Sequence, residues 1–538
     1  MNQKFTRTLG MLALGAMLLP VASCNKDLDQ IPSYSANAEV VYKTAASAEQ
    51  VLARLYATFA VSGQTGPAGS PDISGIDEGF SNYLRQYWQL QEITTDEAIL
   101  GWNDGNLIYV NTLQWNADNE FVRATYDRIF YEIGLCNEFI RQTTDARLSE
   151  RGVTDSDAKL IRQYRAEARL LRALSYWHAI DLFGGGPFTD ENSALGVNPP
   201  YYTRQQLFTY VENELKNLDK GKVLLNPRQV YGRADRAMRW TLQSKLYLNA
   251  KVYTNTDRSA DAVVYADSVI NAGYTLTPTY ANLFLADNNT TGANEIIFPI
   301  TFDGLRTKTY GGMTYLVHAA VGRAVSASSA GINGGWAGLR AKPQLTSIIN
   351  NTSATDSRKD MVFTRGQNPN VDTIGVFSSG PLITKYRNVT SGGKPGSDTV
   401  GDFPDTDFPM FRLADVLLIK AEGLLRKASP DKTTALALIN QVRARATGNL
   451  SSHTNDLPAL TGDGLDDVFN ERTRELFWEG QRRTDLIRFG KFTSNYNWPF
   501  KGGVKAGADV PATRALFPLP TTDLVANPNL AGHQNPGY

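Results

Sequence analysis

Residues 157–183 read DAKLIRQYRAEARLLRALSYWHAIDLF, and the next four residues are GGGP. The apolar positions of this stretch recur every three or four residues, at Leu160, Ile161, Tyr164, Ala168, Leu171, Leu174 and His178. That spacing puts them on one face of a long amphipathic helix. A glycine after the last periodic residue can take the left-handed cap and Pro187 cannot continue a helix, so we expect the helix to end near residue 183.

A second helix is predicted to begin after this break. Thr203 and Gln206 have the spacing of a capping box, and apolar residues follow at helical intervals. The pattern of helix, break and helix recurs at 233–253 with 259–272 and at 411–427 with 433–446. An earlier pair is predicted to join 48–60 with 121–143. Such pairs, with small residues at closely packed positions, resemble tetratricopeptide units.

The spacing between these pairs is irregular, which argues against a regular solenoid. Long insertions rich in Gly, Ser, Asn and Pro, with Tyr and Trp among them, occupy 61–79, 303–340, 364–402 and 492–512. Loops of this length are uncommon in compact domains unless they have a function, and binding surfaces are often carried by loops on a rigid body. The predicted fold class is therefore mainly α: a scaffold of tetratricopeptide-like helix pairs with long loop-rich insertions and a few short strands, such as 295–300.

The first residues have the features of a processing signal. Lys4 and Arg7 precede an apolar run too short to span a bilayer, and residues 18–24 read LLPVASC, which resembles a bacterial lipoprotein signal. We predict a signal peptide at 1–23, lipidation of Cys24 and a polar tether at 24–37. An ordinary secretory signal with a chance cysteine is the alternative. Acyl chains would hold the body to a membrane while the polypeptide stays in water.

The bulk composition is that of a large globular protein. Of 538 residues, 42% are hydrophobic and 20% are charged, and 54 basic residues balance 54 acidic ones. Without residues 1–23, which hold two basic residues, the balance is 52 against 54, so no nucleic-acid partner is expected. No apolar run of transmembrane length follows residue 24. Cys136 has no partner if Cys24 is lipidated, and its apolar context predicts a buried core thiol.

Motifs of common catalytic and metal sites are missing from the sequence. The four histidines, at 178, 318, 453 and 533, are far apart, so no metal site and no cofactor are expected. The glycines at 184–186 lack the Lys-Ser/Thr of a phosphate-binding loop, and no Gly-x-Ser-x-Gly elbow occurs. Asp96 with Glu97 and Asp466 with Asp467 are adjacent pairs, which do not establish the separation that glycoside hydrolysis needs.

Several segments together resemble the RagB/SusD family of outer-membrane nutrient-uptake lipoproteins. They read EARLLRALSY (167–176), RLADVLL (412–418), NQVRARA (440–446), ERTREL (471–476), EGQR (479–482), DLIR (485–488), LFPLP (516–520), NPNL (527–530) and QNPGY (534–538). The charged residues of these motifs lie inside apolar helices, which favours ion pairs that hold helices together over a ligand clamp. In their observed order, the segments extend the resemblance from the lipoprotein signal to the last residue.

The resemblance implies a SusD-like N-terminal region at 38–290 and a RagB/SusD C-terminal region at 291–538, within one compact body. It also implies a surface-exposed protein anchored in the outer membrane through Cys24, with a SusC-like TonB-dependent transporter barrel as partner. The expected ligand is an oligosaccharide, and no reaction is expected. A peptide-binding member of the family, a surface glycoside hydrolase and a structural assembly protein remain alternatives.

Candidate ligand residues follow from sugar chemistry. The C–H faces of sugars pack on aromatic rings, and their hydroxyls bond to Asn, Gln, Asp and Arg side chains. Residues 81–115 combine both kinds, and 310–340 add Tyr and Trp among glycines. The predicted ligand-binding residues are Tyr83, Trp88, Trp102, Asn103, Asp104 and Trp336. Trp102 is favoured because turn-forming neighbours would expose it.

Overall fold

The computed structural model describes residues 38–69, 71–322 and 324–538. The predicted signal peptide at 1–23, the lipidated Cys24 and the tether at 24–37 lie outside the described residues. Across the described ranges, no helix is both long enough and apolar enough to cross a membrane.

The helix predicted from residues 157–183 is α8, which spans Asp155–Leu182. The side chain of Thr154 accepts a hydrogen bond from the amide of Asp157 and caps its first turn. Gly184 follows the helix with a φ of 75°, in the left-handed conformation expected of a glycine at this position. Helix α9, Arg204–Gly221, begins with the predicted capping box of Thr203 and Gln206.

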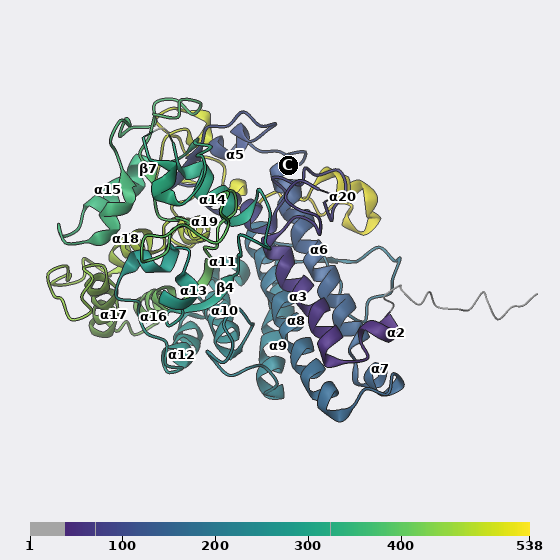
Figure 1. The fold of residues 1–538 in the computed structure, drawn as a ribbon. Helices are drawn as coiled ribbons and strands as arrows, with labels where there is room; N and C mark the ends of the chain where they lie inside the picture. Colours follow the sequence, from purple (N-terminus) through teal and green to yellow (C-terminus); the bar gives the residue numbers. More distant parts are fainter. Residues whose placement is uncertain (1–37, 70, 323) are drawn as a thin grey trace, which may run out of the picture.

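The other predicted pairs are α3 (Ala45–Ala60) with α6 (Glu120–Gln142), α10 (Arg236–Leu248) and α11 (Ala250–Thr254) with α12 (Ser259–Ile270), and α16 (Leu413–Arg426) with α17 (Lys432–Arg445). The two members of each pair contact each other, and α12 also packs on α16. In Figure 1, α3, α6, α8 and α9 run side by side on one half of the molecule, and loop-rich segments cover the other half. The mainly α prediction is confirmed, and the helix pairs are consistent with tetratricopeptide-like units. The division at residue 290 stays a prediction.

Shorter elements complete the described fold. Further helices are α2 (Ala38–Val41), α4 (Tyr83–Glu92), α5 (Ile108–Thr112), α7 (Asp145–Glu150), α13 (Asn288–Thr291), α14 (Gly312–Ala320), α15 (Pro343–Asn350), α18 (Leu465–Leu476), α19 (Arg482–Arg488) and α20 (Thr521–Ala526). The strands form antiparallel pairs: β1 (Ala98–Leu100) with β5 (Leu339–Ala341), β2 (Gly186–Pro187) with β3 (Tyr201–Tyr202), β4 (Ile296–Ile300) with β8 (Phe408–Arg412), and β6 (Val362–Phe363) with β7 (Leu382–Ile383). The strand predicted at 295–300 is β4.

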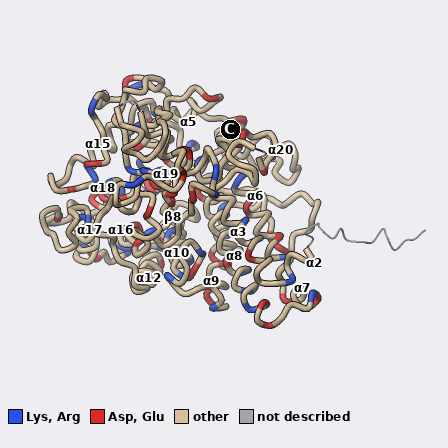
Figure 2. Tube along the Cα trace, viewed as in Figure 1, with Lys and Arg blue, Asp and Glu red and all other residues tan. Residues whose placement is uncertain are grey.

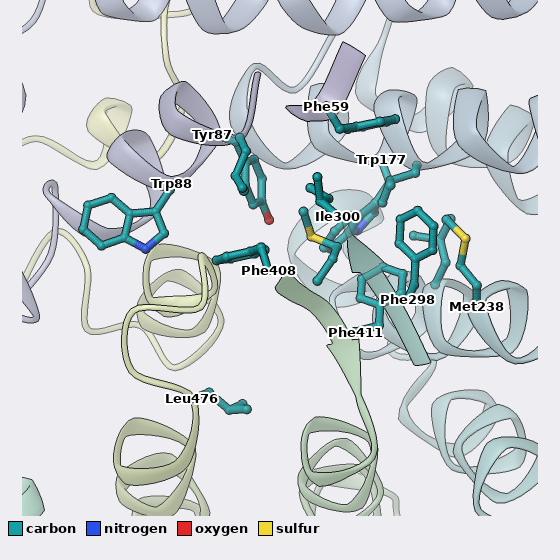
Figure 3. Packing of buried hydrophobic residues seen from close by; sticks show 14 of the residues in the cluster. Phe59, Tyr87, Trp88, Trp177, Met238, Phe298, Ile300, Phe408, Phe411 and Leu476 are labelled. Atoms are coloured by element: carbon teal, nitrogen blue, oxygen red, sulfur yellow. The ribbon is translucent and has the colours of Figure 1, made fainter. Parts of the chain in front are cut away.

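The core lies where these strands meet the helices. Phe298 of β4 and Phe411 of β8 pack with ring centroids 6.3 Å apart, and Met238 of α10 lies beside them (Figure 3). Fully burying a side chain of this kind contributes about 1.5–3 kcal/mol. The predicted core thiol Cys136 is buried on α6 and donates to Glu132.

Buried ion pairs connect the helices of the C-terminal half. Arg412 of β8 bonds to Glu295 at 2.9 Å and to Glu479 at 2.6 Å, and all three side chains are buried. Figure 2 shows acidic and basic residues of β8, α18 and α19 close together in the middle of the molecule. The motif charges pair as Glu167 with Arg233, Arg169 and Arg172 with Glu214, Glu471 with Arg358, Arg472 with Asp485, and Arg482 with Asp96. These contacts confirm the packing role predicted for them.

Candidate functional site

Tyr83 and Trp88 belong to the core and not to a ligand surface. They lie on α4 with 1% and 0% of their surface exposed. The Tyr83 hydroxyl bonds to His178 at 2.8 Å, and the Trp88 indole N–H donates to the carbonyl of Trp478 at 2.8 Å. Figure 3 shows Trp88 among the buried side chains. No face of either ring is open to a sugar, so the prediction that these two residues bind ligand is corrected.

Trp102 and Trp336 are brought together by a strand pair. Strand β1 ends two residues before Trp102, and β5 begins three residues after Trp336. The antiparallel register pairs Leu100 with Leu339, and the amide of Gly101 donates to the carbonyl of Gly338 at 2.9 Å. The two loops therefore leave the sheet side by side.

The two indoles and a tyrosine form an aromatic platform, defined here as Trp102, Trp336 and Tyr310. The ring centroids of Trp102 and Trp336 are 6.2 Å apart, and those of Tyr310 and Trp336 are 6.3 Å apart. Tyr310 is 38% exposed, and both indoles are partly exposed. Aromatic rings held together at a partly open surface offer apolar faces to a ligand.

Local backbone geometry holds the platform in place. The Trp102 indole N–H donates to the carbonyl of Ala337 at 2.9 Å, and the Trp336 amide donates to the carbonyl of His318 at 2.8 Å. Gly338 has a φ of 96°, and a Cβ at this position would lie 2.4 Å from the Trp102 indole nitrogen. Only glycine allows the indole to approach this closely without strain.

A guanidinium lies beneath the platform. Arg85 of α4 sits 5.5 Å from the Trp102 ring centroid and 4.5 Å from that of Tyr315, within cation–π range. It also donates to the carbonyls of Gly79 at 3.2 Å and Tyr310 at 3.5 Å. Burial lowers the pKa of this guanidinium. Arg85 thus connects Gly79 and Tyr310 to the ring of Trp102.

His318 supports the platform from α14. Its imidazole stacks on Trp336 with ring centroids 4.8 Å apart. One ring nitrogen lies 2.7 Å from the carbonyl oxygen of Gly334 and the other 2.9 Å from that of Asp402. Burial lowers the pKa of His318, and the two carbonyl hydrogen bonds act in the opposite direction.

Asn103 and Asp104 follow Trp102 and are exposed. Within the described residues, neither side chain forms a hydrogen bond, so both are free to bond to hydroxyl groups at the edge of the platform. The structure thus brings four of the six predicted residues to one place: Trp102, Asn103, Asp104 and Trp336.

The acidic pair Asp96 and Glu97 takes part in contacts of the protein interior. The Asp96 carboxylate bonds to Arg482 at 2.7 Å and to the Tyr496 hydroxyl at 2.7 Å, in the interior. Its neighbour Glu97 accepts from the amide of Trp478 at 3.0 Å. Among the described residues, no group of three or more His, Cys, Asp or Glu side chains is placed to hold a metal ion.

Tyr310 and His318 lie within the predicted segment 310–340, but sequence reasoning singled out neither residue as part of the site. Tyr310 directly precedes Gly311 and Gly312, and an aromatic residue beside such a turn is a signal of exposure. His318 carries no local signal, because its role depends on Trp336, eighteen residues away in sequence.

Several known proteins are similar to this chain in sequence. The family model described as "SusD family" matches residues 248–538. The chain is 35% identical to the starch-binding protein SusD of Bacteroides thetaiotaomicron, over 100% of both chains. It is 28% identical to SusD-like protein P2 of Formosa agariphila, over 80% of this chain and 83% of that one.

Solved structures share the fold. A SusD homologue from Bacteroides thetaiotaomicron matches with a TM-score of 0.72 at 20% identity, over 93% of this chain and 98% of that one. Surface glycan-binding protein A from the same organism, solved with laminarihexaose, matches with a TM-score of 0.66 at 18% identity, over 91% and 98% of the two chains. The predicted resemblance is confirmed, and the protein belongs to the SusD family.

Proposed function

We propose that the protein binds glycan on the aromatic platform, and that its ligand is an α-glucan of the starch type. The single observation that carries this proposal is the convergence of Trp102, Trp336 and Tyr310 on one partly exposed surface. Their rings suit the C–H faces of glucose units, and Asn103 and Asp104 supply bonds to hydroxyls. The relative that is 35% identical over its full length is named for starch binding, which supports this choice of glycan.

The same proposal holds that the protein binds oligosaccharide without cleaving it. We infer that the protein holds oligosaccharide at the cell surface and passes it to a SusC-like TonB-dependent transporter in the outer membrane. The lipoprotein-like segment 18–24 supports anchoring through Cys24. Membership of the SusD family supports the transporter as partner.

The platform is tested by calorimetry with maltoheptaose and laminarihexaose. The wild type is expected to bind maltoheptaose more tightly, and the double variant Trp102→Ala, Trp336→Ala is expected to lose detectable binding while it stays folded. Trp240→Ala is the matched control, because Trp240 is also partly exposed but lies on α10. Unchanged binding in the double variant would refute the platform.

Three further measurements address the remaining alternatives. If the protein binds laminarihexaose more tightly than maltoheptaose, its ligand is a β-glucan and not an α-glucan. Sustained release of reducing ends from starch would show an enzyme. A peptide retained in native mass spectrometry of protein purified from cells would favour a peptide-binding member of the family.

Anchoring is tested separately with Cys24→Ala. The wild type is expected in the outer-membrane fraction with an acylated Cys24, and the variant is expected to leave that fraction. Retention of the variant in the membrane would contradict lipidation at this residue.

A further inference from the structure

A cavity of about 750 Å³ lies beside Trp336, between the end of α14 and the loop 366–378. Its lining includes Val325, Gly335, Trp336, Gln367 and Phe377. Trp336 is the residue that this cavity and the platform have in common. The volume falls within the range of about 300–1,000 Å³ that is typical of ligand pockets.

Phe377 gives the cavity a second aromatic surface. Its side chain is 40% exposed although it is large and apolar. The ring packs against Gly101, where a Cβ would lie only 3.0 Å from the nearest ring carbon, and the Arg340 guanidinium lies 5.9 Å from its centroid. Gly101 directly precedes Trp102, so Phe377 is held next to the Trp102 loop, and it lines the same cavity as Trp336.

The loop that carries Phe377 is held by hydrogen bonds. The buried Arg340 side chain donates to the carbonyl of Ser379 at 2.8 Å and also to that of Val376. The Gln367 amide nitrogen donates to the carbonyls of Phe377 at 3.1 Å and Gly380 at 2.9 Å. These bonds use the donors of Gln367 and leave its side-chain oxygen as an acceptor for a ligand hydroxyl.

Gly335 allows the loop that carries Trp336 to pass close to the end of α14. A Cβ at Gly335 would lie 2.0 Å from the carbonyl oxygen of Val321, so the loop approaches the helix end too closely for any other residue. The amide of Ala337 donates to the same carbonyl at 3.0 Å. The cavity is therefore bounded by fixed backbone on this side and by Phe377 and Gln367 on the other.

We propose that this cavity is a distal subsite that takes the continuation of a glucan chain beyond the platform. The inference rests on the proposed function and adds that longer chains gain contacts with Phe377 and Gln367 that short chains do not reach. An aromatic face with one polar acceptor suits a sugar ring, whose C–H face is apolar and whose edge carries hydroxyls. Because Trp336 belongs to both the platform and the cavity, the ligand proposed for the cavity is the same glucan chain that binds on the platform.

The experiment compares maltotriose with maltoheptaose in calorimetry. Phe377→Ala is expected to weaken maltoheptaose binding about five- to tenfold and to change maltotriose binding less than about twofold. Gln367→Leu is expected to act in the same direction with a smaller effect. Phe377→Trp keeps an aromatic face and is expected to retain most of the preference for the longer chain.

The control is Leu160→Ala on α8, because Leu160 is 43% exposed and lies on a helix that does not contribute to the site. It should leave both affinities unchanged. Equal weakening for both oligosaccharides, or no change for either, would overturn the distal subsite. If the wild type binds neither oligosaccharide, the proposed function itself fails. This outcome differs from failure of the distal subsite alone, in which the wild type still binds glucan.

Discussion

The imidazole of His318 stacks on the indole of Trp336 at a centroid distance of 4.8 Å and an interplanar angle of 29°. Its two nitrogens face the carbonyls of Gly334 and Asp402, so one ring links α14 to two loops. A neutral imidazole donates from only one nitrogen, which means that both bonds are complete only in the protonated ring. The position of Trp336 therefore depends on a residue that does not lie on the platform surface.

His318→Phe tests this support. The variant keeps a flat ring under Trp336 but removes both ring nitrogens, of which a neutral imidazole uses one to donate to Gly334 or Asp402. Such a hydrogen bond is worth about 0.5–1.5 kcal/mol. We expect maltoheptaose affinity to fall about three- to tenfold in calorimetry, with the far-UV spectrum unchanged. His453→Phe is the control because the His453 side chain is 88% exposed. An unchanged affinity in His318→Phe would show that Trp336 is held by other contacts.

Gly338→Ala tests the close approach of the backbone to Trp102. The methyl group would clash with the indole nitrogen, and the φ of 96° is unfavourable for alanine. We expect maltoheptaose binding to weaken more than about tenfold, which corresponds to about 1.4 kcal/mol. Gly196→Ala is the control, since Gly196 has a φ of 74° and nothing lies within 4 Å of its Cβ position. If both variants bind equally well, Trp102 does not depend on Gly338.

Arg412→Gln tests the buried ion pairs. Removing this guanidinium leaves the buried carboxylates of Glu295 and Glu479 with Arg445 and Lys385 as their remaining cationic partners. Breaking a buried pair in this way costs about 3–5 kcal/mol. The free energy of unfolding, measured with urea, should fall by that amount. Arg306→Gln removes a pair with Asp303 in which the arginine is 82% exposed, so it should cost less than about 1 kcal/mol. Similar losses in both variants would contradict the structural role of the buried pairs.

Glu132→Gln tests a buried carboxyl on α6. Burial raises the pKa of Glu132 to about 8. The Thr58 hydroxyl lies within hydrogen-bond reach of both Glu132 and the carbonyl of Leu55, at 2.8 Å from the latter. A protonated Glu132 can donate to Thr58, which in turn donates to Leu55, so every group has a partner.

The pH dependence follows from this raised pKa. Below pH 4.5, the ordinary pKa of a glutamate side chain, both folded and unfolded chains hold the proton, and the contribution to stability is complete. Between that pH and about 8 only the folded chain holds it, so this contribution is lost by about 1.4 kcal/mol per pH unit as the pH rises.

The Glu132→Gln variant should remove this loss of folding stability with rising pH. The stability of Glu132→Gln relative to the wild type is expected to increase steadily from pH 5 to pH 8 and then to level off, as measured by urea unfolding at each pH. Glu150→Gln is the control for removal of a carboxylate, because the Glu150 side chain is 62% exposed and lies on α7. A flat difference for Glu132→Gln would show that the carboxyl is ionised in the folded chain at neutral pH.

Local sequence determined the helices. The spacing of apolar residues predicted α8, the Thr203 and Gln206 pair predicted the start of α9, and Gly184 predicted the break between them. These features act over a few residues, so their energies are present in the local sequence. The motifs from residue 167 to the last residue also identified the family.

Tertiary structure alone decided which aromatic residues form the platform. Trp88 and Trp102 both lie in a segment rich in polar and aromatic residues, yet Trp88 is enclosed by contacts such as that with Trp478, 390 positions away. Trp102 stays at the surface because the pairing of β1 with β5 places it beside Trp336. Exposure depends on which distant segments cover a side chain, and the sequence around a tryptophan does not contain that information.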